Sequence, residues 1–291
     1  FLKKIESSRK NLREAAIPLV GFECQIEPPK AVYNPYTARQ VGVYYPLNPA
    51  ELPKALQATK KAWPSWRKTS ACERAKILED FADKLDQERE RFIALLVDEA
   101  GKTVEDALEE VREAIDFARY YAANARTLFS SEQILSGPTG EQNTLSWRPR
   151  GVVLCISPWN FPLAIFLGQV VAALATGNTV VAKPAEQTSM IALRAVQMMR
   201  SVGLPDNALQ LVIAKGPDVG NVLLPDERIK AVIFTGSTQT GTLISKTLAQ
   251  RGGEQVPLIA ETGGQNCMIV DSTALPEQVV DDVIHSGFQS A

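Results

Sequence analysis

The sequence predicts an α/β protein built on a doubly wound parallel sheet and preceded by helices. From residue 150 onward, short β-branched runs alternate with helical runs, as they do in βαβ units. The strand candidates are almost continuously apolar, which is typical of parallel strands covered by helices on both faces. They are 152–156, 179–182, 209–213, 231–235, 258–260 and 268–270. The helix candidates are about 162–175, 188–201, 217–224, 238–250 and 276–289.

Residues 1–50 are expected to form a loop-like, extended arm that lies on the domain. Proline lacks a backbone N–H and fixes φ, so it disfavours helix interiors and central strands. The prolines of this segment are Pro18, Pro28, Pro29, Pro35, Pro46 and Pro49. Because the first residue is Phe1 and not Met, we expect the chain to begin inside a longer polypeptide.

Residues 51–127 are expected to be helical. Ser70 and Glu73 match a capping box, in which each side chain satisfies a backbone N–H of the other residue. Apolar residues then recur at helical spacing up to Gly101, whose place is typical of a left-handed helix end. Thr103 and Asp106 predict the start of a further helix.

Residues 128–149 are expected to form a hairpin or a similar excursion from the domain. The segment is polar, and Gly137, Pro138 and Gly140 interrupt any regular pattern. No periodic apolar run crosses it, so it separates the helical part of the chain from the part that predicts the sheet.

The 291-residue chain has an ordinary globular composition, with 45% hydrophobic and 22% charged residues and a net charge of −2. No basic block stands out, and we therefore expect no nucleic-acid binding by this segment. The longest apolar stretch, around residues 161–175, contains Gly168 and Gln169 and is too short to span a bilayer.

Cys24, Cys72, Cys155 and Cys267 lie far apart, and His285 is the only histidine. Zinc sites need ligands in tighter groups such as C-x-x-C, so we predict no metal site. Cys155 lies in an apolar run and Cys267 precedes one, and both are expected to be buried structural residues. The simplest interpretation is reduced thiols in the cytoplasm, a reducing compartment.

Ligands of such sheets bind at the carboxyl ends of the strands, so the residues after each strand are candidates for the site. After the first strand, Pro158 and Pro162 predict a stiff turn around Asn160. A rigidly held amide donor suits an oxyanion site. Asn is also a common helix N-cap, and by themselves these residues favour that alternative.

Lys183 and Glu186 follow the second strand. At a strand end they are suited to bind the two ribose hydroxyls of an adenosine. An acidic residue there favours NAD over its 2'-phosphorylated form. The alternative is a surface ion pair, which the residues alone support equally well.

Gly236 and Ser237 follow the fourth strand, and Glu261 follows the fifth. Gly236 permits a tight turn, and Ser237 opens a helix whose first amides attract phosphate. The pattern is neither G-x-G-x-x-G nor a P-loop, and alone it favours a helix-capping turn. Glu261 is suited to act as a general base, although an isolated carboxylate at such a place is more often a salt-bridge or turn residue.

In this order, the motifs resemble the aldehyde dehydrogenase superfamily over about residues 35–291. They are Pro158-Trp159-Asn160-Phe161-Pro162, Lys183-Pro184-x-Glu186, Phe234-Thr235-Gly236-Ser237-x-x-x-Gly241 and Glu261-x-Gly263-Gly264. The chain is more closely similar to the glutamate-semialdehyde (pyrroline-5-carboxylate) dehydrogenase subgroup, which occurs as a module of bifunctional proline-utilisation proteins. Segments 147–151, 182–188, 260–266 and 286–291 carry that similarity.

The resemblance implies a Rossmann-like NAD-binding part at 150–261 and the start of a truncated catalytic domain at 262–291. Segment 128–149 would belong to an oligomerisation surface, so a homo-oligomer of the full-length protein is expected. A flavin-dependent proline dehydrogenase module is expected upstream in the same chain. The implied cofactor is NAD and the implied substrate is a small aldehyde.

The resemblance also implies roles for single residues. Asn160 would donate to the oxyanion of a thiohemiacetal, Glu261 would activate the hydrolytic water, and Phe161 would face the aldehyde. Lys183 and Glu186 would bind the ribose, and Ser237 would contact the pyrophosphate. The complete set of cofactor-binding residues that it implies is Ile156, Pro158, Trp159, Lys183, Glu186, Phe234, Gly236, Ser237 and Gly263.

The chain departs from the family pattern at the nucleophile. The family cysteine follows the last helix in a Gly-Gln-x-Cys turn, and none of the four cysteines occupies that position before the chain ends at Ala291. We therefore expect an NAD-binding half that is inactive by itself. The alternatives are another NAD-dependent aldehyde dehydrogenase and a non-catalytic NAD-binding fragment.

Overall fold

The computed structural model describes residues 1–10 and 14–289. At its centre lies a five-stranded parallel sheet in the order β10-β9-β6-β7-β8. The chain winds outward from β6 to β8 and then returns to β9 on the other side of β6, so the sheet is doubly wound as predicted. Its strands are β6 (Val152–Ile156), β7 (Thr179–Lys183), β8 (Leu209–Leu211), β9 (Ile229–Gly236) and β10 (Leu258–Thr262).

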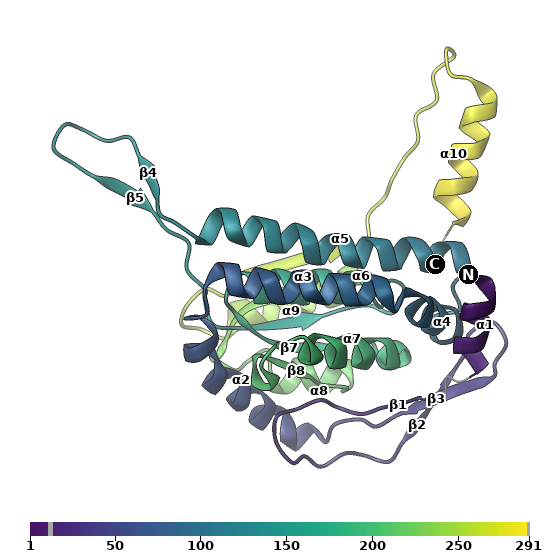
Figure 1. Cartoon of the computed structure of the whole chain (residues 1–291), viewed down its shortest axis with the longest axis horizontal. Helices are drawn as coiled ribbons and strands as arrows, with labels where there is room; N and C mark the ends of the chain where they lie inside the picture. Colours follow the sequence, from purple (N-terminus) through teal and green to yellow (C-terminus); the bar gives the residue numbers. More distant parts are fainter. Residues whose placement is uncertain (11–13, 290–291) are drawn as a thin grey trace.

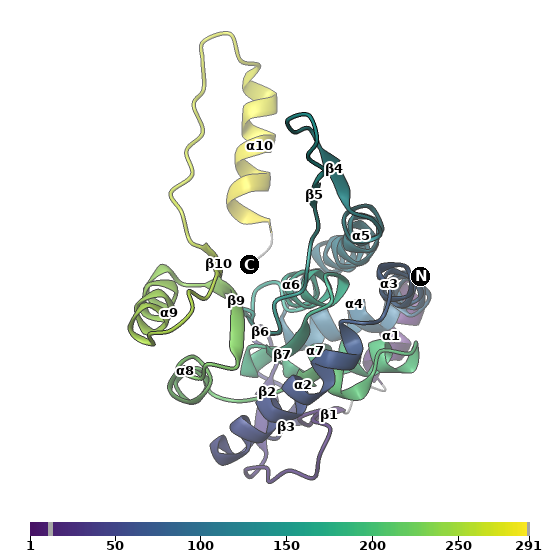
Figure 2. The same ribbon diagram turned by 90° about the vertical axis from the view of Figure 1, so that its left-hand side faces the viewer.

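Alternating side chains of the strands supply two apolar cores, one on each face of the sheet. Val153 and Cys155 belong to the core that includes α6 (Ala164–Ala175) and α7 (Ser189–Ser201). Val152 and Leu154 belong to the core that includes α2 (Leu52–Trp66), α8 (Gly216–Val222) and α9 (Thr238–Gln250). Figure 2 shows α8 and α9 on one side of β9 and α6 on the other. Burial on both faces explains the continuous apolar runs of the sequence.

Three helices form an outer layer over α6 and α7: α3 (Ala71–Gln87), α4 (Arg89–Glu99) and α5 (Val104–Phe129) (Figure 1). The predicted helix signals are confirmed. Ser70 and Glu73 form the capping box, Gly101 has a φ of +72°, and Thr103 caps α5 through Asp106 N. Short 3-10 turns lie at Pro49–Glu51, Glu186–Thr188 and Asp206–Ala208.

Two buried carboxylates of the outer layer cap the helices beneath it. Glu99 accepts hydrogen bonds from the backbone N–H groups of Met190 (2.7 Å) and Ile191 (2.9 Å), at the start of α7. Glu110 accepts from Leu163 N (2.8 Å) and Ala164 N (3.1 Å), at the start of α6. Negative charge is favourable at a helix N-terminus, so these two residues fasten the outer layer to the helices that cover the sheet.

The prediction that residues 1–50 are loop-like was wrong. The segment contains α1 (Leu2–Lys10) and a small sheet of β1 (Glu14–Ala16), β2 (Lys30–Tyr33) and β3 (Gln40–Tyr44) in the order β1-β3-β2. All six prolines lie in the connections or at the start of a 3-10 turn, and none lies inside these elements. The elements are short enough to fit between the prolines, which therefore mark their boundaries.

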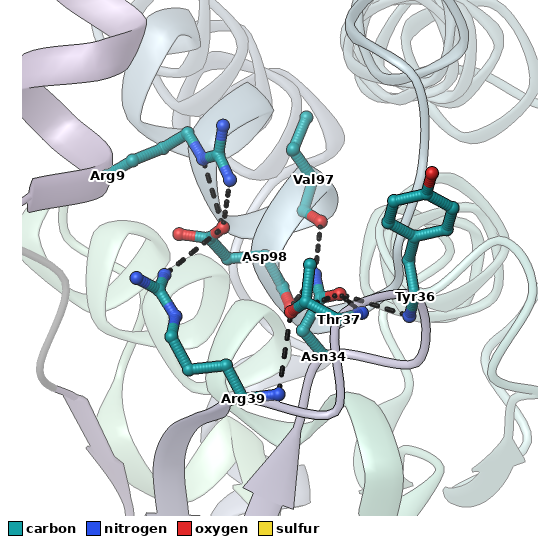
Figure 3. Close-up of polar contacts among 7 residues, drawn as sticks. All are labelled: Arg9, Asn34, Tyr36, Thr37, Arg39, Val97 and Asp98. Atoms are coloured by element: carbon teal, nitrogen blue, oxygen red, sulfur yellow. Dashed lines mark hydrogen bonds and ion pairs between the residues drawn. The ribbon is translucent and has the colours of Figure 1, made fainter.

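A polar cluster fastens this N-terminal segment to the end of α4 (Figure 3). Asp98 Oδ1 accepts hydrogen bonds from Arg9 Nε (2.9 Å) and Nη2 (2.8 Å), and Arg39 lies 3.9 Å away. Asn34 Nδ2 donates to the carbonyls of Val97 (3.0 Å) and Asp98 (2.9 Å), which end the helix. The cluster thus satisfies terminal carbonyls of α4 and holds both α1 and the β2–β3 connection against it.

Two segments extend away from the body (Figure 1). The predicted excursion at 128–149 is confirmed as a hairpin of β4 (Gln133–Leu135) and β5 (Asn143–Leu145). The prediction of a strand at 268–270 was wrong, because the chain leaves the sheet after β10 and finds no neighbouring strand among the described residues. Ile269 is 90% exposed there. The segment leads into α10 (Pro276–Phe288), which buries no residue.

Replacing Gly101 by Ala tests how firmly the N-terminal segment is docked. A β-carbon at Gly101 would lie 2.6 Å from Cγ of Pro35, whereas at Gly203, which also has a positive φ, it would meet nothing within 4 Å. Both variants strain the backbone by about 1 kcal/mol, and Gly101→Ala should lose a further 1–3 kcal/mol, roughly, through the clash. Urea unfolding measures the difference. Equal losses in the two variants would show that the Pro35 segment moves aside freely.

Candidate active site

The strand register brings three predicted residues together at the carboxyl edge of the sheet. Ile156, at the end of β6, lies opposite Lys183 of β7 on one side and opposite Phe234 of β9 on the other. All these strands run parallel, but the winding of the chain reverses at β6, because the next strands β7 and β8 lie on one side of it and β9 lies on the other. In doubly wound sheets, this switch point is where the loops on either side of it diverge and leave room for a ligand.

A cleft of about 500 Å³ opens at this edge, between the turn that follows β6 and the helices α8 and α9. It brings together all the predicted cofactor-binding residues except Glu186 and Gly263. On the sheet side it is lined by Ile156, Ser157, Pro158, Trp159, Lys183, Phe234, Thr235, Gly236 and Ser237.

Lys183 and Glu186 form the predicted pair, with 3.3 Å between Lys183 Nζ and Glu186 Oε1. Lys183 Nζ also donates to the carbonyl of Pro184 (3.0 Å). Burial lowers the pKa of Lys183, and the neighbouring Glu186 opposes that shift. The two residues form an ion pair, as the alternative held, but the side chain of Lys183 is only 7% exposed, so the pair does not lie on the surface. The pair is a preorganised donor and acceptor at the margin of the cleft.

The start of α9 faces the same cleft. Ser237 Oγ accepts a hydrogen bond from Thr240 N (3.2 Å), so Ser237 is a helix N-cap, as the alternative held. A β-carbon at Gly236 would lie 2.7 Å from Cζ of Phe234, so the backbone passes directly over that ring. With thirteen residues, α9 has a dipole that favours anionic groups at this end.

The turn after β6 is held at its beginning by the hydrogen bond from Ser157 N to the carbonyl of Lys183 (3.1 Å). Ser157 Oγ is buried and finds no partner among the described residues. Asn160 does not cap α6, because that helix begins at Ala164 and Glu110 supplies the cap. The capping interpretation of Asn160 was therefore wrong, and the residue lies half-buried in the turn.

Phe161 lies against a buried ion pair. Lys102 Nζ is 3.8 Å from the centroid of the Phe161 ring and 3.0 Å from Glu110 Oε2. A desolvated cation over an aromatic face contributes about 2 kcal/mol. Burial raises the pKa of Glu110, and the charge of Lys102 opposes that shift. One face of Phe161 is thereby occupied by the protein itself.

Gln169 of α6 joins two strand ends. Its Nε2 donates to the carbonyl of Ile156 (3.2 Å) and to Thr235 Oγ1 (3.0 Å). Gln169 is buried, and both acceptors line the cleft. The helix therefore sets the spacing of β6 and β9 at the point where the cleft opens.

Glu261 and Gly263 lie outside the cleft, on and just after the edge strand β10. Glu261 is opposite Thr235 in the strand register and is exposed. Within the part of the chain that the structure describes, it forms no ion pair, contrary to the salt-bridge alternative. Thr238 Oγ1 donates to the carbonyl of Gly263 (3.4 Å), which places Gly263 beside the first residue of α9.

Sequence reasoning did not predict the part of the cleft that α8 and α9 form. It considered the residues after the first, second, fourth and fifth strands, and passed over the connection after 209–213. The Lys215-Gly216-Pro217 turn at a strand end was the signal available there. The missed lining residues are Gly216, Pro217, Val219, Gly220, Asn221 and Leu224 around α8, and Thr240, Leu243, Ile244 and Thr247 on α9.

The cysteines are free, and none of them lines the cleft. Cys155 is buried as predicted, and burial raises the pKa of its thiol. The prediction that Cys267 is buried was wrong, because the segment after β10 lies off the sheet. Among residues 1–10 and 14–289 no group of His, Cys, Asp or Glu is arranged to hold a metal ion. Nor does any helix of that part combine the length and apolar character that a membrane crossing requires.

Comparison with known proteins gives concordant matches. The model of the aldehyde dehydrogenase family matches residues 24–291. The bifunctional protein PutA of Escherichia coli is 44% identical over 280 residues, which are 95% of this chain. The 1-pyrroline-5-carboxylate dehydrogenase 1 of Halalkalibacterium halodurans is 35% identical over 301 residues, which cover 98% of the chain. The crystal structure of a Thermus 1-pyrroline-5-carboxylate dehydrogenase with bound NAD matches with a TM-score of 0.92 and 29% identity over 99% of the chain.

The chain spans only part of the length of these proteins. The matches cover 20% of the Escherichia coli protein, 58% of the Halalkalibacterium protein and 57% of the Thermus chain. The matched part nevertheless contains the whole parallel sheet and the cleft at its carboxyl edge.

The four thiols should differ in alkylation rate according to their burial. Cys72 and Cys267 are exposed, whereas burial raises the pKa of Cys155 and removes its reactive thiolate at pH 8. Iodoacetamide followed by peptide mass spectrometry should show Cys155 reacting at least about tenfold more slowly than Cys267. Equal rates in folded protein would contradict the placement of Cys155 inside the sheet.

Proposed function

This chain belongs to the aldehyde dehydrogenase family, and we propose that it is the NAD-binding part of an L-glutamate γ-semialdehyde dehydrogenase. That enzyme would oxidise the semialdehyde, formed from 1-pyrroline-5-carboxylate, to L-glutamate in proline breakdown. The name of the Halalkalibacterium relative supplies the substrate class. The observation that supports NAD as the cofactor is the cleft that Ile156, Lys183 and Phe234 line from neighbouring positions on three strands.

The residues of the cleft fit a dinucleotide. Phe234, Leu243 and Ile244 supply an apolar surface for an aromatic base. Lys183 and Glu186 would bind the adenosine ribose, with Lys183 donating and Glu186 accepting. The first turn of α9 would receive the pyrophosphate beside Gly236 and Ser237. Ser157 also lines the cleft, and its buried Oγ has no hydrogen-bond partner among the described residues, which is costly for a hydroxyl.

Bound NAD would accept the hydride. The remaining steps belong to the protein, beginning with a cysteine thiolate that adds to the aldehyde. Asn160 would donate its amide N–H to the oxyanion, in a turn whose two ends are fixed. After hydride loss the thioester remains, and Glu261 would take a proton from the water that releases the carboxylic acid. Pro158 and Trp159 would shape the reacting end of the cleft, Gly263 would flank the cofactor, and Phe161 would present its remaining face to the aldehyde.

We place the nucleophile outside the four cysteines of this chain, since none lines the cleft. The chain alone should therefore bind NAD without oxidising aldehyde. Like the PutA relatives, the full protein would carry a flavin-dependent proline dehydrogenase module before this part. The β4–β5 hairpin would contribute to a homo-oligomer, and the free thiols suit the cytoplasm.

Calorimetric titration of the chain with NAD tests the cofactor site. Glu186→Ala should weaken binding roughly 10- to 100-fold, because a hydrogen bond to a charged group is worth about 1.5–3 kcal/mol. Glu254→Ala is the matched control, since Glu254 is paired with Lys230 (2.9 Å) at the other end of β9. It should bind NAD as the parent does. If both variants bind NAD as tightly as the parent, the assignment of the ribose to Lys183 and Glu186 is contradicted.

Glu261→Gln in the full-length dehydrogenase tests the hydrolytic half. Without the base, the first half still delivers one equivalent of NADH, and the thioester then persists. Rapid-mixing absorbance at 340 nm should show a burst followed by turnover reduced roughly 100- to 10,000-fold. Loss of the burst itself would place Glu261 in the first half instead.

A further inference from the structure

We propose that Lys102 and Glu110 are positioning residues for the turn that carries Asn160 and Phe161. The proposal rests on the function assigned above to Asn160, and it adds two residues from the outer helical layer. Lys102 Nζ lies 3.8 Å from the centroid of the Phe161 ring and 3.0 Å from Glu110 Oε2. Glu110 Oε1 receives the backbone N–H groups of Leu163 and Ala164. One buried pair therefore holds both the ring and the backbone that follow Asn160.

Asn160 depends on this pair because the turn has few other attachments. At its beginning, Ser157 N is bonded to the carbonyl of Lys183 (3.1 Å). At its end, Phe161 is held by Lys102, and the start of α6 is held by Glu110. The exposed fraction of Trp159 is 54%, so the middle of the turn contributes little packing. The direction of the Asn160 amide is thus set by the two ends.

Lys102 is itself fixed by its main chain. It follows Gly101, whose left-handed conformation ends α4, and its N–H donates to the carbonyl of Leu96 (3.3 Å). The Gly101 backbone lies against Pro35, since a β-carbon at Gly101 would come within 2.6 Å of the proline Cγ. The backbone of Lys102 is therefore fixed, and its buried side chain reaches the Phe161 ring from a defined position.

The pair acts through other residues and not on a ligand. The side chains of Lys102 and Glu110 are 1% and 0% exposed, so neither is accessible to substrate or cofactor. Neither lines the cleft at the carboxyl edge of the sheet. A loss of the pair should accordingly change the chemical step more than NAD binding, because Lys183, Phe234 and Gly236 keep their places in the cleft, whereas a displacement of about 1 Å at a reacting group costs about 100-fold in rate.

The test uses the double variant Lys102→Met/Glu110→Gln. Both charges are removed together, because a single buried charge without its partner would destabilise the whole fold whatever its effect on the turn. The Gln oxygen still accepts from Leu163 and Ala164. Glu99→Gln is the matched control. Glu99 caps α7 through Met190 and Ile191 in the same way as Glu110 caps α6. However, α7 is not the helix that follows the turn.

The first measurement is the ¹⁹F spectrum of the chain labelled with 5-fluorotryptophan, recorded without NAD. Trp159 adjoins Asn160, and its resonance is assigned with Trp159→Phe. The double variant should shift or broaden the Trp159 resonance and leave those of Trp63, Trp66 and Trp147 in place, while Glu99→Gln moves none of them. An unchanged Trp159 resonance would overturn the proposal, whatever the chain binds.

The second measurement is steady-state kinetics of the full-length dehydrogenase that carries the same substitutions. The double variant should lower kcat about 10- to 100-fold, with a smaller change in KM for NAD. Glu99→Gln should keep kcat. A full kcat together with a displaced Trp159 resonance would separate the pair from catalysis and overturn the positioning role. Failure of the parent to bind NAD would instead count against the proposed function, since the ¹⁹F result does not depend on cofactor.

Discussion

The parallel register of β7, β6 and β9 is the constraint on which the rest of the structure depends. It places Lys183, Ile156 and Phe234 in one row across neighbouring strands. The loops that leave this row diverge, since β7 is followed by α7 on one face of the sheet and β9 is followed by α9 on the other face. A shift of one residue in any pairing would turn the apolar side chains of that strand toward the wrong core. Burial on both faces therefore also fixes the row of residues that borders the cleft.

The outer helical layer contributes more than cover. Glu99 and Glu110 reach inward from α4 and α5 and cap α7 and α6, so the positions of two sheet-covering helices depend on carboxylates that belong to another layer. At its other end α6 is capped by Arg74, whose Nε donates to the carbonyl of Ala175 (3.0 Å). Held at both ends, α6 carries Gln169 to the ends of β6 and β9. The geometry of the cleft is thus transmitted through backbone hydrogen bonds.

Local patterns predicted the elements well where local physics decides them. The β6 strand, the capping box at Ser70 and the helix end at Gly101 follow from residue types over a few positions. The strand expected at 268–270 failed because a strand needs a neighbour, and apolar character alone does not supply one. The N-terminal strands escaped prediction because prolines were taken to dominate the whole segment, although they mark only its boundaries.

The residues of the candidate site were likewise predicted only where local sequence shows them. Residues at strand ends, such as Lys183 and Gly236, were found because strand ends are visible in the sequence. Glu110 and Lys102 were not, because their partners at Leu163 and Phe161 lie more than fifty residues away and only the folded layers bring them together. The role of Asn160 as a helix cap was a reasonable local interpretation. It failed because a buried carboxylate from another helix had already satisfied that helix end.

Hydrogen exchange of the chain with and without NAD, followed by mass spectrometry, tests most directly whether the carboxyl edge of the sheet is the cofactor site. Bound cofactor should slow exchange in segments 156–161, 183–189 and 234–242, each of which contains residues that line the cleft. The β4–β5 hairpin should exchange at the same rate in both samples. Protection confined to the opposite end of the strands, around Lys60, Trp63 and Arg150, would contradict a cofactor site at the carboxyl edge.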